Sequence, residues 1–197
     1  MFIALTWYAY NLVKIRLSIL FLKQARELDF NPKAIMGTGA GWSVPDFEKA
    51  RGKDTNGILN ADFCHSANPK GLLPETGALL ETFLKRFEKK YGRIPATHAT
   101  GGFLGGWILF TKVLPEAGGL DAEAVRKAAL NVDMPYGSVI NGWGCKFDPP
   151  DSPSAGENNK KFAGIFQWQD GKQPLIFPEN LATGKLIMVP LPPWSKR

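Results

Sequence analysis

The sequence is poor in the residues that build disulfide scaffolds and metal sites. Its 197 residues include two cysteines, Cys64 and Cys145, and two histidines, His65 and His98. Two cysteines are too few for a disulfide-stapled domain, and their spacing lacks the paired arrangement of a zinc site. We therefore expect no metal. A single Cys64–Cys145 disulfide and two separate thiols are both compatible with this pattern.

Long apolar runs are also missing. Residues 1–13 carry no charge, but Lys14 and Arg16 interrupt the apolar run before residues 17–22. The run is shorter than the roughly 20 apolar residues of a transmembrane helix, and it lacks the basic start and the cleavage site of a signal peptide. We therefore expect neither a membrane span nor an export signal. The pattern predicts a buried strand over residues 1–8 and an amphipathic helix over residues 15–28.

The chain has no strong excess of one charge. Lysine and arginine number 24 against 18 acidic residues, which gives a net charge of +6 and a pI of about 9.3. The basic residues are scattered, so this charge favours solubility rather than a nucleic-acid partner. Hydrophobic residues make up 44% and charged residues 21%. This composition is typical of a globular protein and excludes a disordered or coiled-coil chain.

Strands and helices alternate along the first two thirds of the chain. Apolar runs predict strands over residues 33–37 and 57–63. An apolar stripe opposite a charged face predicts a helix over residues 79–91. Residues 103–113 are nearly all apolar, so we expect a buried helix there, with Gly102, Gly105 and Gly106 permitting close packing.

The spacing of apolar residues changes in the last third of the chain. Asp121 caps a further predicted helix, and residues 138–147 are expected to be extended. Asp170-Gly171 is a strong hairpin dipeptide, and it predicts that residues 162–168 pair with residues 173–177. We expect the proline-rich tail to run extended over the surface.

A glycine loop follows the strand predicted over residues 33–37. Its spacing, Gly-x-Gly-x-Gly over residues 37–41, matches neither a P-loop nor the dinucleotide fingerprint, so we expect no nucleotide cofactor. Ser43 can cap the next helix, with Asp46 answering from the third position. A helix start directly after a strand is a frequent ligand site in open α/β folds.

Five motifs in a fixed order carry a resemblance to a known family. The chain is similar to the C-terminal half of a type I periplasmic solute-binding protein, in the branched-chain amino-acid-binding (leucine-binding-like) family of ABC transporters. The motifs are FNPKAIMGTGAGW (residues 30–42), GILNADF (57–63), KKYGRIP (89–95), NGWG (141–144) and FQWQDG (166–171).

The resemblance implies an α/β fold with parallel sheets flanked by helices, in which two lobes trap a small ligand at a hinge. Residues 1–60 would belong to the second lobe and residues 61–145 to the first. Residues 146–185 would return to the second lobe, and residues 186–197 would form the tail. Most of the first lobe is missing from this pattern, so we expect a fragment of the fold.

The function implied by the resemblance is solute capture for an ABC transporter, in the periplasm or outside the cell. The ligand would be an amino acid or a related amide or carboxylate, and the partners would be a permease and its ATPase. In leucine-type binders the loop after the strand supplies an acid for the ligand ammonium, whereas residues 37–42 offer none. The loop therefore does not single out leucine as the ligand.

Six residues are carried over as candidate ligand contacts. Tyr8 and Tyr10 would end the first strand, Gly39, Ala40 and Trp42 lie in the glycine loop, and Phe103 starts the apolar helix. The aromatic side chains could equally be core residues, and Trp42 could simply cover the helix start. His98 fits a surface position better than the cleft.

Three alternatives stay open at this point. A ligand-sensing receptor or regulatory domain would use the same fold, and a fragment without binding activity would expose the faces of incomplete sheets. An enzyme would need a catalytic constellation. Asp62, Cys64 and His65 follow one strand, but a cysteine and a histidine so close in sequence rarely face one substrate, so we expect no enzyme.

Overall fold

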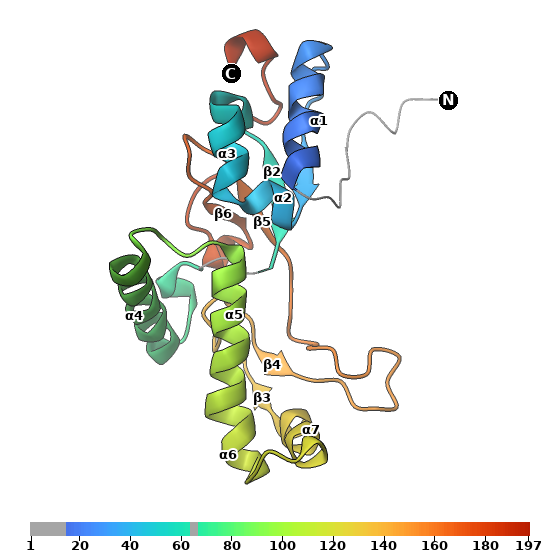
Figure 1. Ribbon diagram of the computed structural model, residues 1–197, viewed down its shortest axis with the longest axis vertical. Helices are drawn as coiled ribbons and strands as arrows, with labels where there is room; N and C mark the ends of the chain where they lie inside the picture. The colour runs from blue at the N-terminus through green and yellow to red at the C-terminus, as the bar shows by residue number, and fades with distance from the viewer. Residues whose placement is uncertain (1–14, 64–66) are drawn as a thin grey trace. The chain divides into compact units, whose positions relative to one another are not determined.

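The computed structural model describes residues 15–63 and 67–197, which divide into two compact units. Unit 1 combines residues 15–63 with residues 163–197, and unit 2 spans residues 67–162 (Figure 1). The predicted strand over residues 1–8 lies outside the described residues. The chain therefore leaves unit 1 once and returns to it once.

The second division between the units lies further along the chain than the lobe boundary predicted after residue 145, and the lobe boundaries stay a prediction. The predicted boundaries follow residues 60 and 145, whereas the units divide after Phe63 and Phe162. The segment after residue 145 stays in unit 2 because its polar side chains bond there. Asn158 accepts a hydrogen bond from the Lys146 amide at 3.0 Å and donates one to the Gly144 carbonyl at 3.0 Å.

Unit 1 contains a four-stranded mixed sheet in the order β1-β2-β5-β6. Only β1 and β2 run parallel, with Gly37 opposite Asn60, and the remaining pairs are antiparallel. The strands are β1 (Met36–Thr38), β2 (Leu59–Asp62), β5 (Gly164–Gln167) and β6 (Leu175–Phe177). The sheet is thus α/β in character but not uniformly parallel.

The core of unit 1 lies between this sheet and helices α1 (Ile15–Glu27), α2 (Ala40–Ser43) and α3 (Pro45–Arg51), which gather together in Figure 1. Buried aromatic rings dominate it. Trp42 contacts Phe47 with ring centroids 5.1 Å apart, and Phe47 contacts Trp168 at 6.3 Å. Such rings bury large apolar areas and contribute strongly to stability.

The C-terminal tail belongs to this core, which differs from the predicted extended surface segment. Leu191 and Trp194 are buried against the cluster of Leu22, Ile35 and Trp42. The Leu191 amide bonds the Lys33 carbonyl at 2.7 Å, and the Trp194 indole bonds the Phe30 carbonyl at 2.8 Å. The prolines keep the backbone of the tail extended, and its apolar side chains pack into the unit 1 core.

The hairpin around Asp170-Gly171 is confirmed. Both residues have positive φ, 49° and 76°, as a tight two-residue turn requires. The Asn56 side chain fixes the turn, because it donates to the Asp170 carboxylate at 3.2 Å and accepts from the Asp170 amide at 2.8 Å. The predicted helix over residues 15–28 is confirmed as well.

Unit 2 is a set of helices with a small two-stranded sheet. Its helices are α4 (Pro74–Tyr91), α5 (Thr97–Ile108), α6 (Leu114–Ala117) and α7 (Ala122–Asn131). A π-helical turn, Leu109–Val113, joins α5 to α6, so the two form one long rod in Figure 1. The strands β3 (Asp133–Met134) and β4 (Cys145–Lys146) pair antiparallel. The Asp121 cap on α7 is confirmed, because its carboxylate accepts from the amides of Glu123 and Ala124.

Two expectations for unit 2 are corrected. Residues 138–147 are not one strand, because the chain turns at Gly142, whose φ is 90°, and only Cys145 and Lys146 pair in a sheet. The apolar helix of residues 103–113 is buried on one side only. Leu104 and Ile108 enter the core, whereas Phe110 is 69% exposed.

Candidate functional site

The carboxyl ends of the parallel strands β1 and β2 lie at one edge of the unit 1 sheet. Gly39 follows β1 directly and adopts φ 63° and ψ −158°, a conformation that a side chain would strain. Its amide donates to the Ala61 carbonyl at 2.9 Å, which extends the pairing of β1 with β2 by one residue. Helix α2 then begins at Ala40, as expected for a strand-to-helix turn.

A buried hydrogen bond ties this turn to β2. The Ser43 hydroxyl donates to the Asp62 carboxylate at 2.7 Å, and the other carboxylate oxygen accepts from the Phe63 amide, also at 2.7 Å. Ser43 therefore does not cap α3, which starts at Pro45 with Val44 as its capping residue and no side-chain capping bond. Both oxygens of Asp62 are engaged, so this carboxylate holds the sheet edge together.

Thr38, the last residue of β1, also lies at this edge, and no sequence motif marks it as a site residue. Its hydroxyl oxygen is buried and has no hydrogen-bond partner among the described residues. A buried hydroxyl without a partner costs free energy, and such groups often await a ligand or water. The signal in the sequence is a hydroxyl residue at the last position of a strand, directly before a glycine.

The predicted ligand contacts are distributed over different places. Tyr8 and Tyr10 lie outside the described residues. Gly39 and Ala40 sit at the carboxyl edge of β1. Trp42 points away from solvent: its side chain is fully buried, and its ring packs against Phe21 with centroids 5.9 Å apart. The surroundings of Trp42 are therefore those of a core residue, which is the alternative interpretation given above.

The last predicted contact, Phe103, belongs to unit 2. It is half-buried on α5 and stacks on Phe83 of α4 with ring centroids 4.3 Å apart. His98, also on α5, is exposed. Phe103 thus serves the α4–α5 packing, and only Gly39 and Ala40 among the described candidates share the sheet edge with Thr38.

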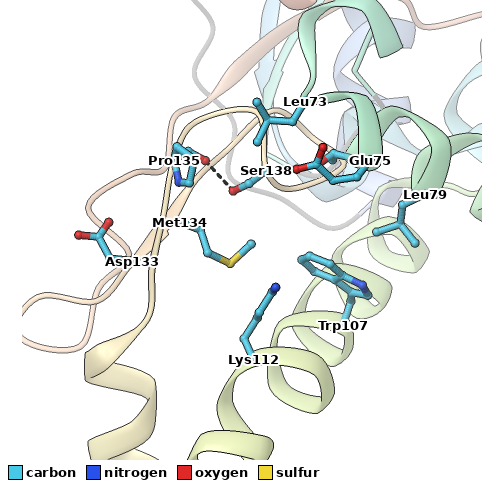
Figure 2. A pocket seen from close by; sticks show the side chains of 10 residues that line it. Leu73, Glu75, Leu79, Trp107, Lys112, Asp133, Met134, Pro135 and Ser138 are labelled. Carbon is cyan, nitrogen blue, oxygen red and sulfur yellow. Dashed lines mark hydrogen bonds between the residues drawn. The ribbon is translucent and has the colours of Figure 1, made fainter.

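Unit 2 contains a separate hollow of about 490 Å³ between α4, α5 and β3. Figure 2 shows side chains from these three elements around it, with Leu79, Trp107 and Met134 forming apolar walls. Three charged residues also line it: Asp133 of β3, Glu75 at the start of α4, and Lys112, whose ammonium lies 5.6 Å from the centre of the Trp107 ring.

The polar groups on the β3 side of this hollow are already engaged. Asp133 bonds the ammonium groups of Lys146 and Lys160, and these bonds lower its pKa to about 2. The Ser138 hydroxyl donates to the Pro135 carbonyl at 2.6 Å, the bond dashed in Figure 2. Of the three charged residues that line the hollow, Asp133 is thus held in ion pairs.

The described residues contain no group suited to a metal. Within residues 15–63 and 67–197, no three histidine, cysteine or acidic side chains gather closely enough to hold an ion. Cys145 is a buried free thiol in this part of the chain, and burial raises its pKa, whereas Cys64 and His65 lie outside it. None of the helices in this part of the chain combines the length and apolar character needed to cross a membrane.

Comparison with known proteins identifies relatives of the chain. The sequence model of a family described as periplasmic binding protein matches residues 15–157. A Leu/Ile/Val-binding protein homolog 7 from Brucella suis is 32% identical over 171 residues, and a homolog 8 from Brucella abortus is 32% identical over 174 residues. Each match covers 86% of this chain and 40% of the relative. The chain therefore spans well under half the length of these curated relatives.

Solved structures share the fold at low sequence identity. A leucine-binding protein from Thermotoga maritima superposes with a TM-score of 0.62 at 20% identity, over 88% of this chain and 45% of that one. A branched-chain amino-acid ABC transporter protein from Thermus thermophilus, solved with bound valine, gives 0.60 at 16% identity, over 92% and 46%. These likenesses establish the α/β fold of type I periplasmic binding proteins, of which this chain represents part.

Proposed function

Because the chain belongs to the periplasmic binding protein family, we propose that it forms part of the substrate-binding component of an ABC transporter. In this role it captures a small amino acid or a related amide or carboxylate in a cleft between lobes. The observation that carries the proposal is the family match over residues 15–157, and the names of the relatives, which are those of Leu/Ile/Val-binding proteins rather than enzymes, support it.

The carboxyl edge of β1 and β2 is the surface of unit 1 that best suits this role. Ligands of open α/β sheets bind beyond the carboxyl ends of strands, where the backbone is free to approach them. Gly39 exposes backbone there without a side chain, and Thr38 supplies a buried hydroxyl with no partner among the described residues. Ser43 and Asp62 hold this edge in shape, and Trp42 supports it from the core.

The remaining predicted contacts complete the proposal. Tyr8, Tyr10 and Phe103 stay predicted contacts from the family pattern. The partners would be the membrane permease and its ATPase, and the location would be the periplasm or the cell exterior. Unit 1 would correspond to part of the second lobe and unit 2 to part of the first.

A thermal-shift and calorimetric screen tests this function. The purified chain is titrated with leucine, isoleucine, valine, small amides, carboxylates and sugars. A ligand that binds only the folded state raises the melting temperature, by an amount that grows with its concentration over its dissociation constant. We expect one class of amino acid or close analogue to do so. No response to any of these compounds would contradict the proposal.

A variant at Thr38 tests whether the carboxyl edge of β1 and β2 contacts the ligand. Thr38→Val removes the hydroxyl but keeps the shape, and removing a buried hydroxyl without a partner should leave stability equal or higher. We expect binding of the ligand found in the screen to weaken about tenfold, as after the loss of one hydrogen bond to a ligand. Thr82→Val, on the exposed side of α4, is the matched control. Equal binding by Thr38→Val and wild type would remove Thr38 from the site.

A further inference from the structure

Helix α4 carries a row of aromatic rings along one side. Phe83, Phe87 and Tyr91 recur every four residues, so their side chains lie next to one another on the helix. The ring centroids of Phe83 and Phe87 are 5.8 Å apart, and those of Phe87 and Tyr91 are 4.5 Å apart. Phe103 of α5 extends the row, because it stacks on Phe83 at 4.3 Å. Two helices of unit 2 therefore share one continuous aromatic surface.

A groove of about 280 Å³ runs along this row of rings, close to the lower end of the roughly 300–1,000 Å³ of small-molecule sites. All of its lining residues belong to unit 2, so none of them is part of the carboxyl edge of β1 and β2. We call it the aromatic groove, and the lining residues that matter here are Phe83, Phe87, Tyr91, Phe103, Arg86 and Lys90.

The two basic residues of the aromatic groove have no acidic neighbour on their helix. Arg86 and Lys90 lie one helical turn apart, and like charges at this spacing repel each other. The positions three and four residues before and after each of them hold no aspartate or glutamate. None of the ion pairs among the described residues includes either side chain. The repulsion between them is therefore not offset by a carboxylate in this part of the chain.

The positive charges lie beside the rings. The Lys90 ammonium is 5.2 Å from the centre of the Tyr91 ring, and the Arg93 guanidinium is 5.5 Å from the centre of the Phe87 ring. The described residues that line the aromatic groove include no carboxylate. An apolar floor with cations at its rim is complementary to a molecule that has a ring body and a negative group.

The shape of the groove favours a small molecule over a flat surface. The side chains of Phe83, Phe87 and Phe103 are half-buried between α4 and α5, where a bilayer surface cannot reach them but a planar molecule can. We propose that the aromatic groove binds a small organic anion in which a flat apolar ring system carries one carboxylate or sulfonate. The rings hold its body, and Arg86 and Lys90 bind its negative group.

Calorimetric titration of the full chain with naphthalene-2-sulfonate tests this site. The neutral naphthalene-2-sulfonamide has nearly the same shape and is the matched ligand control. We expect one-to-one binding of the sulfonate, about tenfold tighter than that of the sulfonamide, because charge-assisted hydrogen bonds are the stronger ones. Amide chemical shifts of ¹⁵N-labelled chain locate the ligand, and we expect the changes within residues 79–91 and around residue 103. The probe is not an amino acid, so failure to bind amino acids would contradict only the proposed function.

Two double variants on the same helix separate the groove from general charge. Arg86→Gln with Lys90→Gln should weaken sulfonate binding about tenfold and leave sulfonamide binding unchanged. Lys85→Gln with Lys89→Gln removes the same charge from exposed positions of α4 that do not line the groove. This control should bind the sulfonate as wild type does. All four side chains are exposed, so both double variants should keep the fold, which their melting temperatures check.

Four results would overturn the proposal. The first is no saturable binding of the sulfonate, and the second is equal binding of the sulfonamide. The third is equal sulfonate binding by the two double variants, or shift changes confined to other residues. The fourth is sedimentation of the chain with vesicles of phosphatidylcholine and phosphatidylserine without binding of the sulfonate, because a lipid surface would then be the occupant.

Discussion

Gly37 shows how one residue of the glycine loop serves the core rather than a ligand. A Cβ atom at this position would lie 2.1 Å from Cγ of Trp42, so the indole occupies the space where a side chain would be. The glycine-rich pattern of residues 37–41 therefore has two causes. Gly37 makes room for Trp42, whereas Gly39 adopts a backbone conformation with positive φ.

Substitution of Gly37 tests this close contact. Gly37→Ala forces the buried indole or strand β1 to shift, and such overpacking should lower the free energy of unfolding by about 2–3 kcal/mol. Chemical denaturation followed by tryptophan fluorescence measures the loss. Gly102→Ala is the matched control, since open space around it allows a gain of up to about 1 kcal/mol from helix propensity. Equal stability of the two variants would contradict the packing of Trp42 on β1.

At the scale of elements, the pairing of β3 with β4 depends on a cluster of charges. Asp133 on β3 accepts hydrogen bonds from Lys146 on β4 and from Lys160, which arrives from the following loop. One carboxylate thus joins three segments of unit 2. The two ammonium groups favour its charged form and hold its pKa at about 2.

The lowered pKa predicts a dependence of stability on pH. The pKa of Asp133 lies below the value of about 3.9 for an unfolded chain, so its contribution is present above about pH 4 and is lost as the pH falls toward 2. Asp133→Asn should therefore be less stable than wild type at pH 6 and equal to it near pH 2. Urea unfolding across this range measures the difference, with Asp151→Asn as an exposed control. A constant difference across the range would contradict the role of the carboxylate charge.

Local patterns predict the elements, and non-local contacts decide the site. The helix over residues 15–28, the Asp121 cap and the Asp170-Gly171 hairpin follow from spacing and turn chemistry, and the structure contains all three. Ser43 behaves differently because Asp62, nineteen residues away, offers its hydroxyl a buried partner. No local pattern reveals such a bond.

The sequence predicts only part of the candidate site, because some of its properties depend on contacts between distant segments. The sequence predicts a helix start directly after a strand, and Gly39 lies between β1 and α2 as expected. The burial of Trp42 depends on rings from α1 and α3, and the isolation of the Thr38 hydroxyl depends on what surrounds β1. These properties arise only when distant segments pack together.

At the scale of the whole molecule, the described residues form two separate hydrophobic cores. One cluster includes Phe47, Trp42 and Trp194 and lies entirely within unit 1, while the other includes Leu104 and Cys145 and lies entirely within unit 2. Among residues 15–63 and 67–197, none belongs to both clusters. We therefore expect the stability of each unit to respond to its own core.

A substitution in one core, read out in both units, checks this independence. Phe47→Ala should lower the stability of unit 1 by about 3–5 kcal/mol, the usual cost of removing a buried phenylalanine. Hydrogen exchange of β2 reports this loss. In a Cys64→Ser background, the rate of thiol labelling reports unit 2, because burial of Cys145 hides its thiol and raises its pKa. Faster labelling after Phe47→Ala would mean that the units unfold together.

The register of β2 with β5 has a consequence for engineering. Asp62 pairs directly with Gly164, so the chain leaves unit 1 and returns to it at neighbouring positions of one antiparallel pair. In topological terms, unit 2 is inserted between the antiparallel strands β2 and β5, at the position where a β-hairpin has its turn. A short turn in its place would close the same hairpin with a far smaller loop, which lowers the entropy lost on folding. Unit 1 could thus be encoded as a single small domain, and other domains could be inserted between β2 and β5 in place of unit 2.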